Sequence, residues 1–314
     1  AADDRDASSA GTAARTDSAQ SADETKTRDF SGIAIPTVAE PIADFVDGRP
    51  SLTRSKAGPL ILGCDSMFLL DGECYGKPHS EEVARERLRA MRGATGELWT
   101  GHCLIDFASG RMVRGASKAT LHFCEYSDLD IERYIATGEP LEVAGSFTLE
   151  GFGGAFIDSI EGDPHGIIGL SLPLARRLAA QLGVEWTDLW NVTRSDLVPR
   201  RAGIRPLVCA ASRGRHQGCA GGTRMSIPLI LASQSRPRRD VLFSAGICPT
   251  IRVSHVDEPA ALEREAAALG VTVNDLSVEQ RVMILATAKA EAVHQAYRNI
   301  ADTAAHARGE RVVG

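Results

Sequence analysis

The sequence predicts an α/β protein, because short apolar runs alternate with amphipathic helical patterns along two long blocks of the chain. Its 314 residues are 43% hydrophobic and 24% charged, a composition typical of a globular protein with a buried core. No run approaches the roughly 18 consecutive apolar residues of a membrane-spanning helix, and the N-terminal residues lack a signal-peptide pattern. The net charge of −6 argues against a general nucleic-acid-binding surface. We therefore expect a cytoplasmic protein with neither a membrane nor a nucleic-acid partner.

Two segments lack the periodicity of packed elements. Residues 1–28 are mainly Ala, Ser, Thr and Asp, and they cannot bury enough apolar surface to offset the entropy lost on ordering. Residues 29–57 carry a few apolar side chains among prolines, so we expect all of 1–57 to be disordered or loosely packed. Residues 198–224 are rich in Gly and Arg and aperiodic, which indicates a flexible linker or tail; their basic character would also suit RNA contact.

The first block covers residues 58–197. Its apolar run PLILGCDSMFLL predicts a buried strand that ends near Cys64 and Asp65. A helix follows, with Ser80 as its N-cap and Gly93 just past its end. The remaining patterns predict strands over 97–107 and 119–126 and amphipathic helices over 127–138 and 172–183.

The second block covers residues 225–314. It opens with the strand pattern PLILAS, followed by a helix from about Arg238 to Ala245 and a strand with the sequence TIRVSH. A long helix begins at Ser277, with Gln280 three residues on at the spacing of a capping box.

Seven cysteines are dispersed singly, without a C-x-x-C pair, which indicates reduced thiols and not a disulfide framework or a zinc site. Cys64 stands beside an acidic residue, but a cysteine at such a position is typically a small buried neighbour and not a nucleophile.

The stretch LILASQSRPRRD, residues 229–240, ends a strand pattern in small polar residues at the start of a helix. Free backbone amides and the positive end of the helix dipole suit an anion there. Arg236, Arg238 and Arg239 add guanidinium groups that match phosphate oxygens. The alternative is an exposed helix start with solvated arginines.

Carboxylates and a lysine stand near other predicted strand ends. Asp65 lies where α/β sheets place their ligands, and it could orient water or hold a divalent metal; the alternative is an aspartate that caps the next segment. Lys77 is held between Gly76 and Pro78 in a tight turn, and Glu258 follows a predicted strand. Alone, Lys77 and Glu258 would each be more typical of a solvated loop. Together with Arg238, they indicate metal-assisted attack of water on a phosphoric anhydride, and no Walker loop, G-x-S-x-G elbow or G-x-G-x-x-G motif competes with them.

Several motifs of the sequence resemble those of a known family. The motifs LILASQSRPRRDVL, VSHVDE, ATAKAEAV, GCDSMFLLDGECYGKP, TGEPLEVAGSFTLEGFGG and IEGDPHGIIGLSLPL look like those of the Maf (septum-formation inhibitor-like) nucleoside triphosphate pyrophosphatases. The resemblance implies a twisted mixed sheet flanked by helices, in two lobes around a cleft. It further implies hydrolysis of nucleoside triphosphates to monophosphate and pyrophosphate, clearance of non-standard nucleotides, a divalent cation (Mg²⁺ or Mn²⁺) and a homodimer.

The order of the two blocks differs from the order in that family. Residues 225–314 resemble the N-terminal half of the Maf-like catalytic domain, and residues 58–197 resemble its C-terminal half. Joining Gly314 to Ala1 would restore the family order, with Met225 as the start and 1–57 as an insertion between the halves. The chain therefore resembles a circular permutant.

The resemblance also implies a role for each candidate residue. Asp65 matches the aspartate that accepts the proton of the attacking water, and Asp65 and Glu258 match the acidic residues that bind the metal. The remaining matches hold the substrate: Ser233, Ser235, Arg238, Lys77 and Lys289.

Three positions depart from the family pattern. Pro237 stands in place of the first arginine of the usual Ser-Pro-Arg-Arg, Ser66 replaces the common threonine after the aspartate, and Glu150 replaces a glutamine that helps to select the base. Since such positions govern specificity, the preferred base is not carried over. Two rival functions stay open: a cell-division regulator that binds partners and has a vestigial nucleotide site, and a phosphatase that releases orthophosphate from the γ position.

Overall fold

The computed structural model describes residues 45–46, 49–50, 57–192 and 226–307. Strands β1 (Phe45–Val46) and β2 (Arg49–Pro50) form an antiparallel pair of their own. The rest of the predicted insertion, the predicted linker at 198–224 and the two ends that a permutation would join lie outside the described residues.

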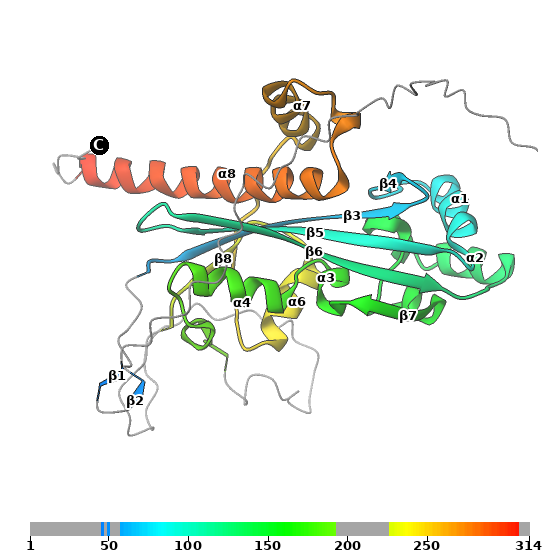
Figure 1. Cartoon of the computed structure of the whole chain (residues 1–314), viewed down its shortest axis with the longest axis horizontal. Helices are drawn as coiled ribbons and strands as arrows, with labels where there is room; N and C mark the ends of the chain where they lie inside the picture. Colours follow the sequence, from blue (N-terminus) through cyan, green and yellow to red (C-terminus); the bar gives the residue numbers. More distant parts are fainter. Residues whose placement is uncertain (1–44, 47–48, 51–56, 193–225, 308–314) are drawn as a thin grey trace, which may run out of the picture. The chain divides into compact units, whose positions relative to one another are not determined.

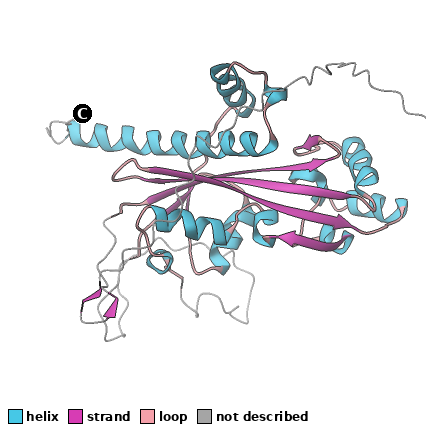
Figure 2. Cartoon of the chain, in the orientation of Figure 1, coloured by secondary structure: helices cyan, strands magenta, loops and turns pink. Residues whose placement is uncertain are grey.

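A mixed sheet of seven strands forms the centre of the described part (Figure 1, Figure 2). Its order is β7-β6-β5-β3-β8-β9, with β4 paired to β3 off this path. Neighbours from β7 to β3 are antiparallel, whereas β8 is parallel to both β3 and β9. The α/β class with a mixed sheet is confirmed. The strands are β3 (Leu60–Leu70), β4 (Glu73–Tyr75), β5 (Thr95–Asp106), β6 (Met112–Phe123), β7 (Ile157–Gly162), β8 (Leu229–Leu231) and β9 (Thr250–Ile251).

Helices flank both faces of this sheet (Figure 1). The long helix α8 lies along one face, and α3, α4 and α6 lie on the other. The α-helices are α1 (Glu81–Met91), α2 (Asp128–Ile135), α3 (Pro164–Ile168), α4 (Leu172–Gln181), α6 (Arg236–Ser244), α7 (Glu258–Leu269) and α8 (Val278–Ala307). Short 3₁₀ turns are η2 (Glu139–Glu142), η3 (Ala144–Ser146), η4 (Phe152–Phe156), η5 (Trp186–Leu189) and η6 (Val273–Asp275). None of the described helices combines the length and the apolar character that crossing a bilayer requires.

Strand β3 feeds the core on both faces, because successive side chains of a strand point to opposite sides. Leu60 and Leu62 pack in the core cluster that includes Leu178 of α4, whereas Ile61 packs in the cluster that includes Ala286 of α8. The predicted end of this strand near Asp65 is wrong. The strand continues to Leu70, because β5 pairs with it as far as Leu69 and β4 pairs with its last three residues.

Several predicted helix starts are confirmed. The Ser80 hydroxyl accepts from the Val83 amide at 3.3 Å at the start of α1. At the start of α8, the amide of Gln280 donates to Ser277 Oγ at 3.2 Å, and the Ser277 amide donates to Gln280 Oε1 at 2.8 Å, which completes the capping box. Helix α6 begins two residues earlier than predicted, since Pro237 needs no amide partner in a first helical turn.

Other boundaries were wrong. The predicted strand TIRVSH is reduced to β9, which pairs with β8 through Thr250 and Ile251 alone. Helix α7 was not predicted, although Asp257 caps it by accepting from the amide of Ala260 at 3.1 Å.

Two glycines let the backbone of α8 lie directly on the sheet. A β-carbon at Gly63 of β3 would collide with the carbonyl oxygen of Ala286 and come within 2.8 Å of the Ala290 nitrogen. A β-carbon at Gly101 of β5 would collide with the carbonyl oxygen of Val282. This close packing fixes the height of α8 above β3 on both sides of residue 289.

The cysteine prediction is confirmed at Cys64, which is fully buried and whose thiol pKa is raised to about 12, above all by burial. Cys74, Cys103 and Cys124 are also free. Cys248 is disulfide-bonded, so the expectation of reduced thiols is wrong at that position.

Candidate functional site

The site lies where the parallel part of the sheet stops. Strand β8 pairs with β3 only as far as Leu231 opposite Leu62, and the Ala232 amide then donates to the Leu62 carbonyl at 2.8 Å. Beyond this point β3 runs on without β8. Asp65 and Ser66 therefore lie mid-strand, yet just past the carboxyl end of the parallel pairing, which is where α/β sheets place their ligands.

An ion-paired triad occupies the α8 side of this edge. Lys289 Nζ donates to Asp65 Oδ1 at 2.5 Å and lies 2.8 Å from Glu258 Oε1. The side chains of Lys289 and Asp65 are 12% and 11% exposed, whereas that of Glu258 is 50% exposed. Helix α8, strand β3 and the first residue of α7 thus meet at one ammonium group.

Asp65 is buried and lies near two cations, Lys289 of α8 and Arg238 of α6. Burial raises the pKa of its carboxyl group, and the positive charges of Lys289 and Arg238 oppose that rise. A carboxylate with a raised pKa, beside cations that favour its ionised form, is suited to accept a proton from water.

Arg238 of α6 holds the other side of the edge with a three-point fork. Its Nε donates to the Gly169 carbonyl at 2.8 Å, Nη1 donates to Ser233 Oγ at 3.3 Å, and Nη2 donates to Ser66 Oγ at 3.1 Å. This arrangement aims a permanent positive charge at the loop between β8 and α6. Because Asp65 and Ser66 are consecutive, their side chains leave opposite faces of β3, so cations approach the edge from both faces.

The serines of that loop leave a helix start open. The Ser235 amide donates to Ser233 Oγ at 3.2 Å, and Ser235 is the N-cap of α6 but makes no side-chain capping bond. Free amides in the first turn of a helix suit an anion such as phosphate.

A buried polar chain behind Ser66 was missed by sequence reasoning. Ser66 Oγ lies 2.8 Å from Thr100 Oγ1, which in turn donates to the Gly166 carbonyl at 2.8 Å. His102 is fully buried and its pKa is lowered to about 3, above all by burial. Its Nε2 accepts from the Ser171 amide at 2.9 Å, so the proton of the neutral ring lies on Nδ1, 3.1 Å from the Thr100 carbonyl. These partners are backbone groups and distant residues, and no motif signals them.

Of the predicted substrate residues, Lys289 hydrogen-bonds to Asp65, whereas Lys77 pairs with another carboxylate. Lys77 Nζ lies 3.5 Å from Glu142 Oε2, and both side chains are exposed. The pairing of β4 with β3 ends at Tyr75 opposite Phe68, two residues before Lys77.

Glu150 is exposed in the loop before η4. Partial burial of its carboxyl group raises its pKa, and the negative charges of Glu139 and of Asp240 on α6 add to the rise. The loop itself is tied down by Glu139, whose Oε1 accepts from Tyr134 at 2.9 Å and from the Gly153 amide at 3.0 Å. Because the charge of Asp240 acts on Glu150, Glu150 lies within electrostatic reach of α6.

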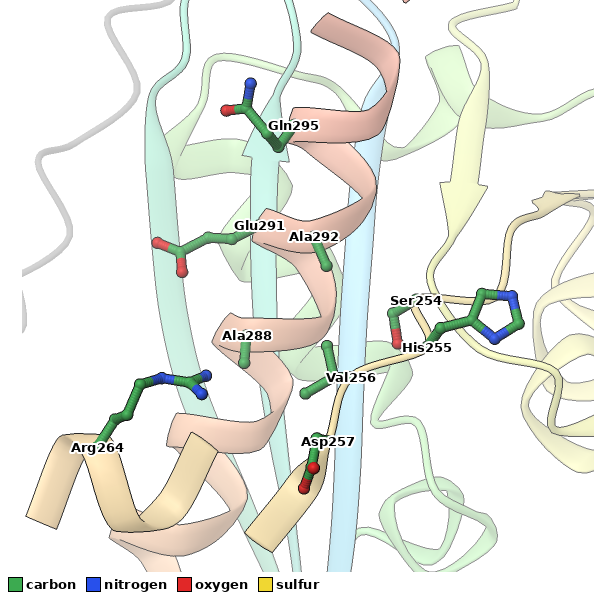
Figure 3. A pocket seen from close by; sticks show the side chains of 9 residues that line it. All are labelled: Ser254, His255, Val256, Asp257, Arg264, Ala288, Glu291, Ala292 and Gln295. Carbon is green, nitrogen blue, oxygen red and sulfur yellow. The ribbon is translucent and has the colours of Figure 1, made fainter. Parts of the chain in front are cut away.

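Two pockets lie beside α7 and α8. The larger, of about 430 Å³, is lined by the segment 254–257 and one flank of α8, and Arg264 reaches toward α8 from α7 (Figure 3). Neither Asp65 nor Lys289 lines either pocket. The smaller, of about 360 Å³, contains Glu258 and Met67, and Met67 shares the α8 face of β3 with Asp65. Because Glu258 belongs to the triad, the smaller pocket is the one that adjoins the site.

Asp65 and Glu258 are the residues here that could bind a divalent cation. Their oxygens already converge on one positive charge, and hard oxygen donors suit Mg²⁺ and Mn²⁺. Within residues 57–192 and 226–307, no cluster of three or more His, Cys, Asp or Glu side chains is placed to hold a metal. The donor set fits a cation that takes its remaining ligands from water and from a bound phosphate.

Comparisons with known proteins relate the chain to one family. The model of a family described as Maf-like protein matches residues 13–182 and 228–313, in two separate segments. A Bifidobacterium longum protein named nucleoside triphosphate pyrophosphatase/Nudix hydrolase fusion protein is 68% identical over 216 residues, which cover 63% of this chain and 45% of that protein. The chain thus spans less than half the length of that relative. Proteins named nucleoside triphosphate pyrophosphatase from Streptomyces coelicolor and Leifsonia xyli are each 47% identical, over 52% and 49% of this chain and 80% and 70% of their own lengths.

Proposed function

This chain belongs to the family of Maf-like proteins, and on that premise we propose that it is a nucleoside triphosphate pyrophosphatase, a hydrolase that releases a nucleoside monophosphate and pyrophosphate. The observation that carries the proposal is the convergence of Asp65, Lys289 and Arg238 at one edge of β3, with 2.5 Å between Lys289 Nζ and Asp65 Oδ1. Cations beside one buried carboxylate suit an enzyme that binds a polyanion and activates water.

In the proposed mechanism, a water molecule attacks the α-phosphorus through its oxygen, and a carboxylate oxygen of Asp65 takes a proton from that water. The bond between the α-phosphorus and the oxygen that bridges to the β-phosphate breaks, and pyrophosphate leaves. A general base placed in this way contributes ~10²–10⁴-fold to the rate. Arg238, Lys289 and Lys77 would stabilise the charge on the phosphate oxygens, and the amides at the start of α6 would bind one phosphate group.

A divalent cation would be held by Asp65 and Glu258. When bound, it neutralises charge that develops on the phosphate oxygens. Its identity as Mg²⁺ or Mn²⁺, the clearance of non-standard nucleotides and a homodimer in the cytoplasm stay predictions from the family resemblance.

Product analysis over a panel of nucleoside triphosphates, with Mg²⁺ present, tests the proposal. We expect equimolar monophosphate and pyrophosphate from at least one substrate. Orthophosphate with a nucleoside diphosphate would instead indicate attack at the γ-phosphorus. Hydrolysis of no substrate in the panel would contradict the enzyme and favour the partner-binding regulator.

For the base, we propose that Glu150 takes part in selection. An ionised carboxylate can only accept hydrogen bonds, so it favours bases that present N–H donors and disfavours the carbonyl-rich edges of uracil and thymine. A carboxylate that a bound base buries against such a carbonyl costs roughly 1–3 kcal/mol.

The Glu150→Gln variant should therefore shift relative kcat/KM toward UTP and dTTP by about one to two decades, compared with CTP and GTP. The measurement is kcat/KM for these four nucleotides in both forms. If the ratios stay unchanged, Glu150 does not contact the base, and Ser66 and Pro237 become the positions to test.

A further inference from the structure

We propose that Lys289 holds the position of the divalent cation in the free protein, so that the cation enters the site together with the nucleotide and not before it. This proposal rests on the proposed function, because it assumes a triphosphate substrate at the same site. It concerns the order of binding, which the proposed reaction itself leaves open.

In the free protein, the Lys289 ammonium group lies between the two carboxylates that would bind a metal. Lys289 Nζ lies 2.5 Å from Asp65 Oδ1 and 2.8 Å from Glu258 Oε1, so one ammonium group already joins the two carboxylates that would bind a metal. With 12% of its side chain exposed, Lys289 is not a mobile surface lysine.

The packing of α8 on β3 restricts how Lys289 can move away from the carboxylates. Gly63 brings the backbone of Ala286 and Ala290 against β3, and these residues flank Lys289 on the helix. Lys289 cannot withdraw by a movement of α8 as a whole without opening that contact. The ammonium leaves the carboxylates by a change in its own side-chain torsions, which needs another negative partner within reach.

The described part of the protein offers a metal ion few ligands at this site. Mg²⁺ in phosphate-processing sites is usually held by one or two carboxylates, and the substrate phosphates and water complete its six ligands. Asp65 and Glu258 supply two carboxylates, and in the described part of the chain no third acidic, His or Cys side chain joins them. A cation arriving alone would find few protein oxygens and a positive charge between them.

A nucleoside triphosphate removes both obstacles. Its phosphate oxygens give Lys289 an alternative anion, and they add ligands to the metal that Asp65 and Glu258 can then bind. A cation that comes as the metal–nucleotide complex therefore replaces the ammonium, whereas a free cation has to compete with it.

Titration of the full chain with Mn²⁺, without any nucleotide, tests this order of binding. The free Mn²⁺ concentration is read from its electron paramagnetic resonance signal. We expect weak binding to the parent protein and about tenfold or tighter binding to Lys289→Met, because the competing charge is gone. Adding Glu258→Gln to Lys289→Met should remove the gain, which would assign the new site to the carboxylate pair.

The matched control is Lys118→Met. Lys118 also pairs with a carboxylate, at 2.8 Å from Glu97 Oε1, but on the exposed surface of β6. This variant should bind Mn²⁺ like the parent protein. Lys289→Gln serves as the second variant if thermal melting shows that Lys289→Met does not fold.

Mn²⁺ binding by the parent protein as tight as that by Lys289→Met would overturn the proposal, and so would a gain that survives Glu258→Gln. No step of the titration involves hydrolysis. A chain that proves inactive toward every nucleotide would therefore refute the proposed function and leave the Mn²⁺ result to be judged on its own.

Discussion

At the scale of single residues, the site depends on groups whose shape matters as much as their charge. Arg238 reaches three acceptors on three segments, from β3 through the loop before α6 to the carbonyl of Gly169. An ammonium group is a point charge and cannot reproduce a planar fork of this kind. The neighbouring Arg239 pairs with Asp240, at 3.6 Å, on the exposed side of α6.

We therefore predict that Arg238→Lys lowers kcat/KM for the best nucleotide by about 10- to 100-fold, which corresponds to charge-assisted hydrogen bonds of roughly 1.5–3 kcal/mol. Arg239→Lys, the matched control, should stay within a few-fold of the parent. Steady-state kinetics on both variants decides the matter. Equal, small losses would remove Arg238 from the phosphate site.

His102 provides a prediction for the dependence of stability on pH. Its pKa is about 3 in the folded protein and 6.5 in an unfolded chain, so between these values the unfolded state binds more protons. The folded state is then favoured by rising pH and is weakened as the pH falls below 6.5. The free energy of unfolding should drop by an amount that approaches about 1.4 kcal/mol per pH unit from this one side chain.

The His102→Gln variant keeps hydrogen-bonding capacity toward Ser171 and Thr100 but does not titrate. Urea unfolding of both proteins at pH 7 and pH 5 should give a clearly smaller loss of stability for the variant. Parallel pH dependence in the two proteins would mean that His102 is not held neutral.

At the scale of elements, the contact between α8 and the sheet places the chemistry. Gly63 and Gly101 remove the β-carbons that would keep the helix backbone away from β3 and β5. Lys289 reaches Asp65 because the helix lies this low. A side chain at either glycine would lift α8, and the ammonium would move with it.

For Gly63→Ala we predict a loss of stability of roughly 1–3 kcal/mol, as is typical of overpacking, and a larger loss of activity than the destabilisation alone explains. The control is Gly115→Ala in β6, where the new methyl group meets only the flexible tip of Leu174, at 3.0 Å. Thermal melting and pyrophosphate release on both variants provide the test. Parent-like activity in a folded Gly63→Ala variant would show that activity does not depend on how closely α8 packs on the sheet.

Elements with strong local signals could be predicted from the sequence, and those that depend on distant partners could not. The capping box at Ser277 and the N-cap at Ser80 involve neighbours three residues apart, and both were found. The continuation of β3 past Asp65 depends on pairing with β5, about thirty residues away, which a local pattern does not show, and on the short hairpin with β4, which was passed over. The short β9 was overestimated for the same reason, since its pairing with β8 ends at Ile251.

At the scale of the whole molecule, the site is assembled from segments that lie far apart in the sequence. Asp65 belongs to the first block, whereas Glu258, Lys289 and Arg238 belong to the second, and the blocks meet where β3 runs beside β8 (Figure 1). The candidate residues of the site were named from the sequence by family resemblance. Their arrangement could not be predicted, because the ion pair between Lys289 and Asp65 spans 224 positions and no local pattern encodes it.

The central claim is that Asp65 activates the water that attacks a nucleoside triphosphate bound at this edge. The most direct measurement is single-turnover pyrophosphate release by Asp65→Asn, beside a binding isotherm for the same nucleotide. The account predicts nearly unchanged binding and a rate at least ~10²-fold lower, the low end for loss of a general base. A rate within a few-fold of the parent, with binding intact, would contradict it.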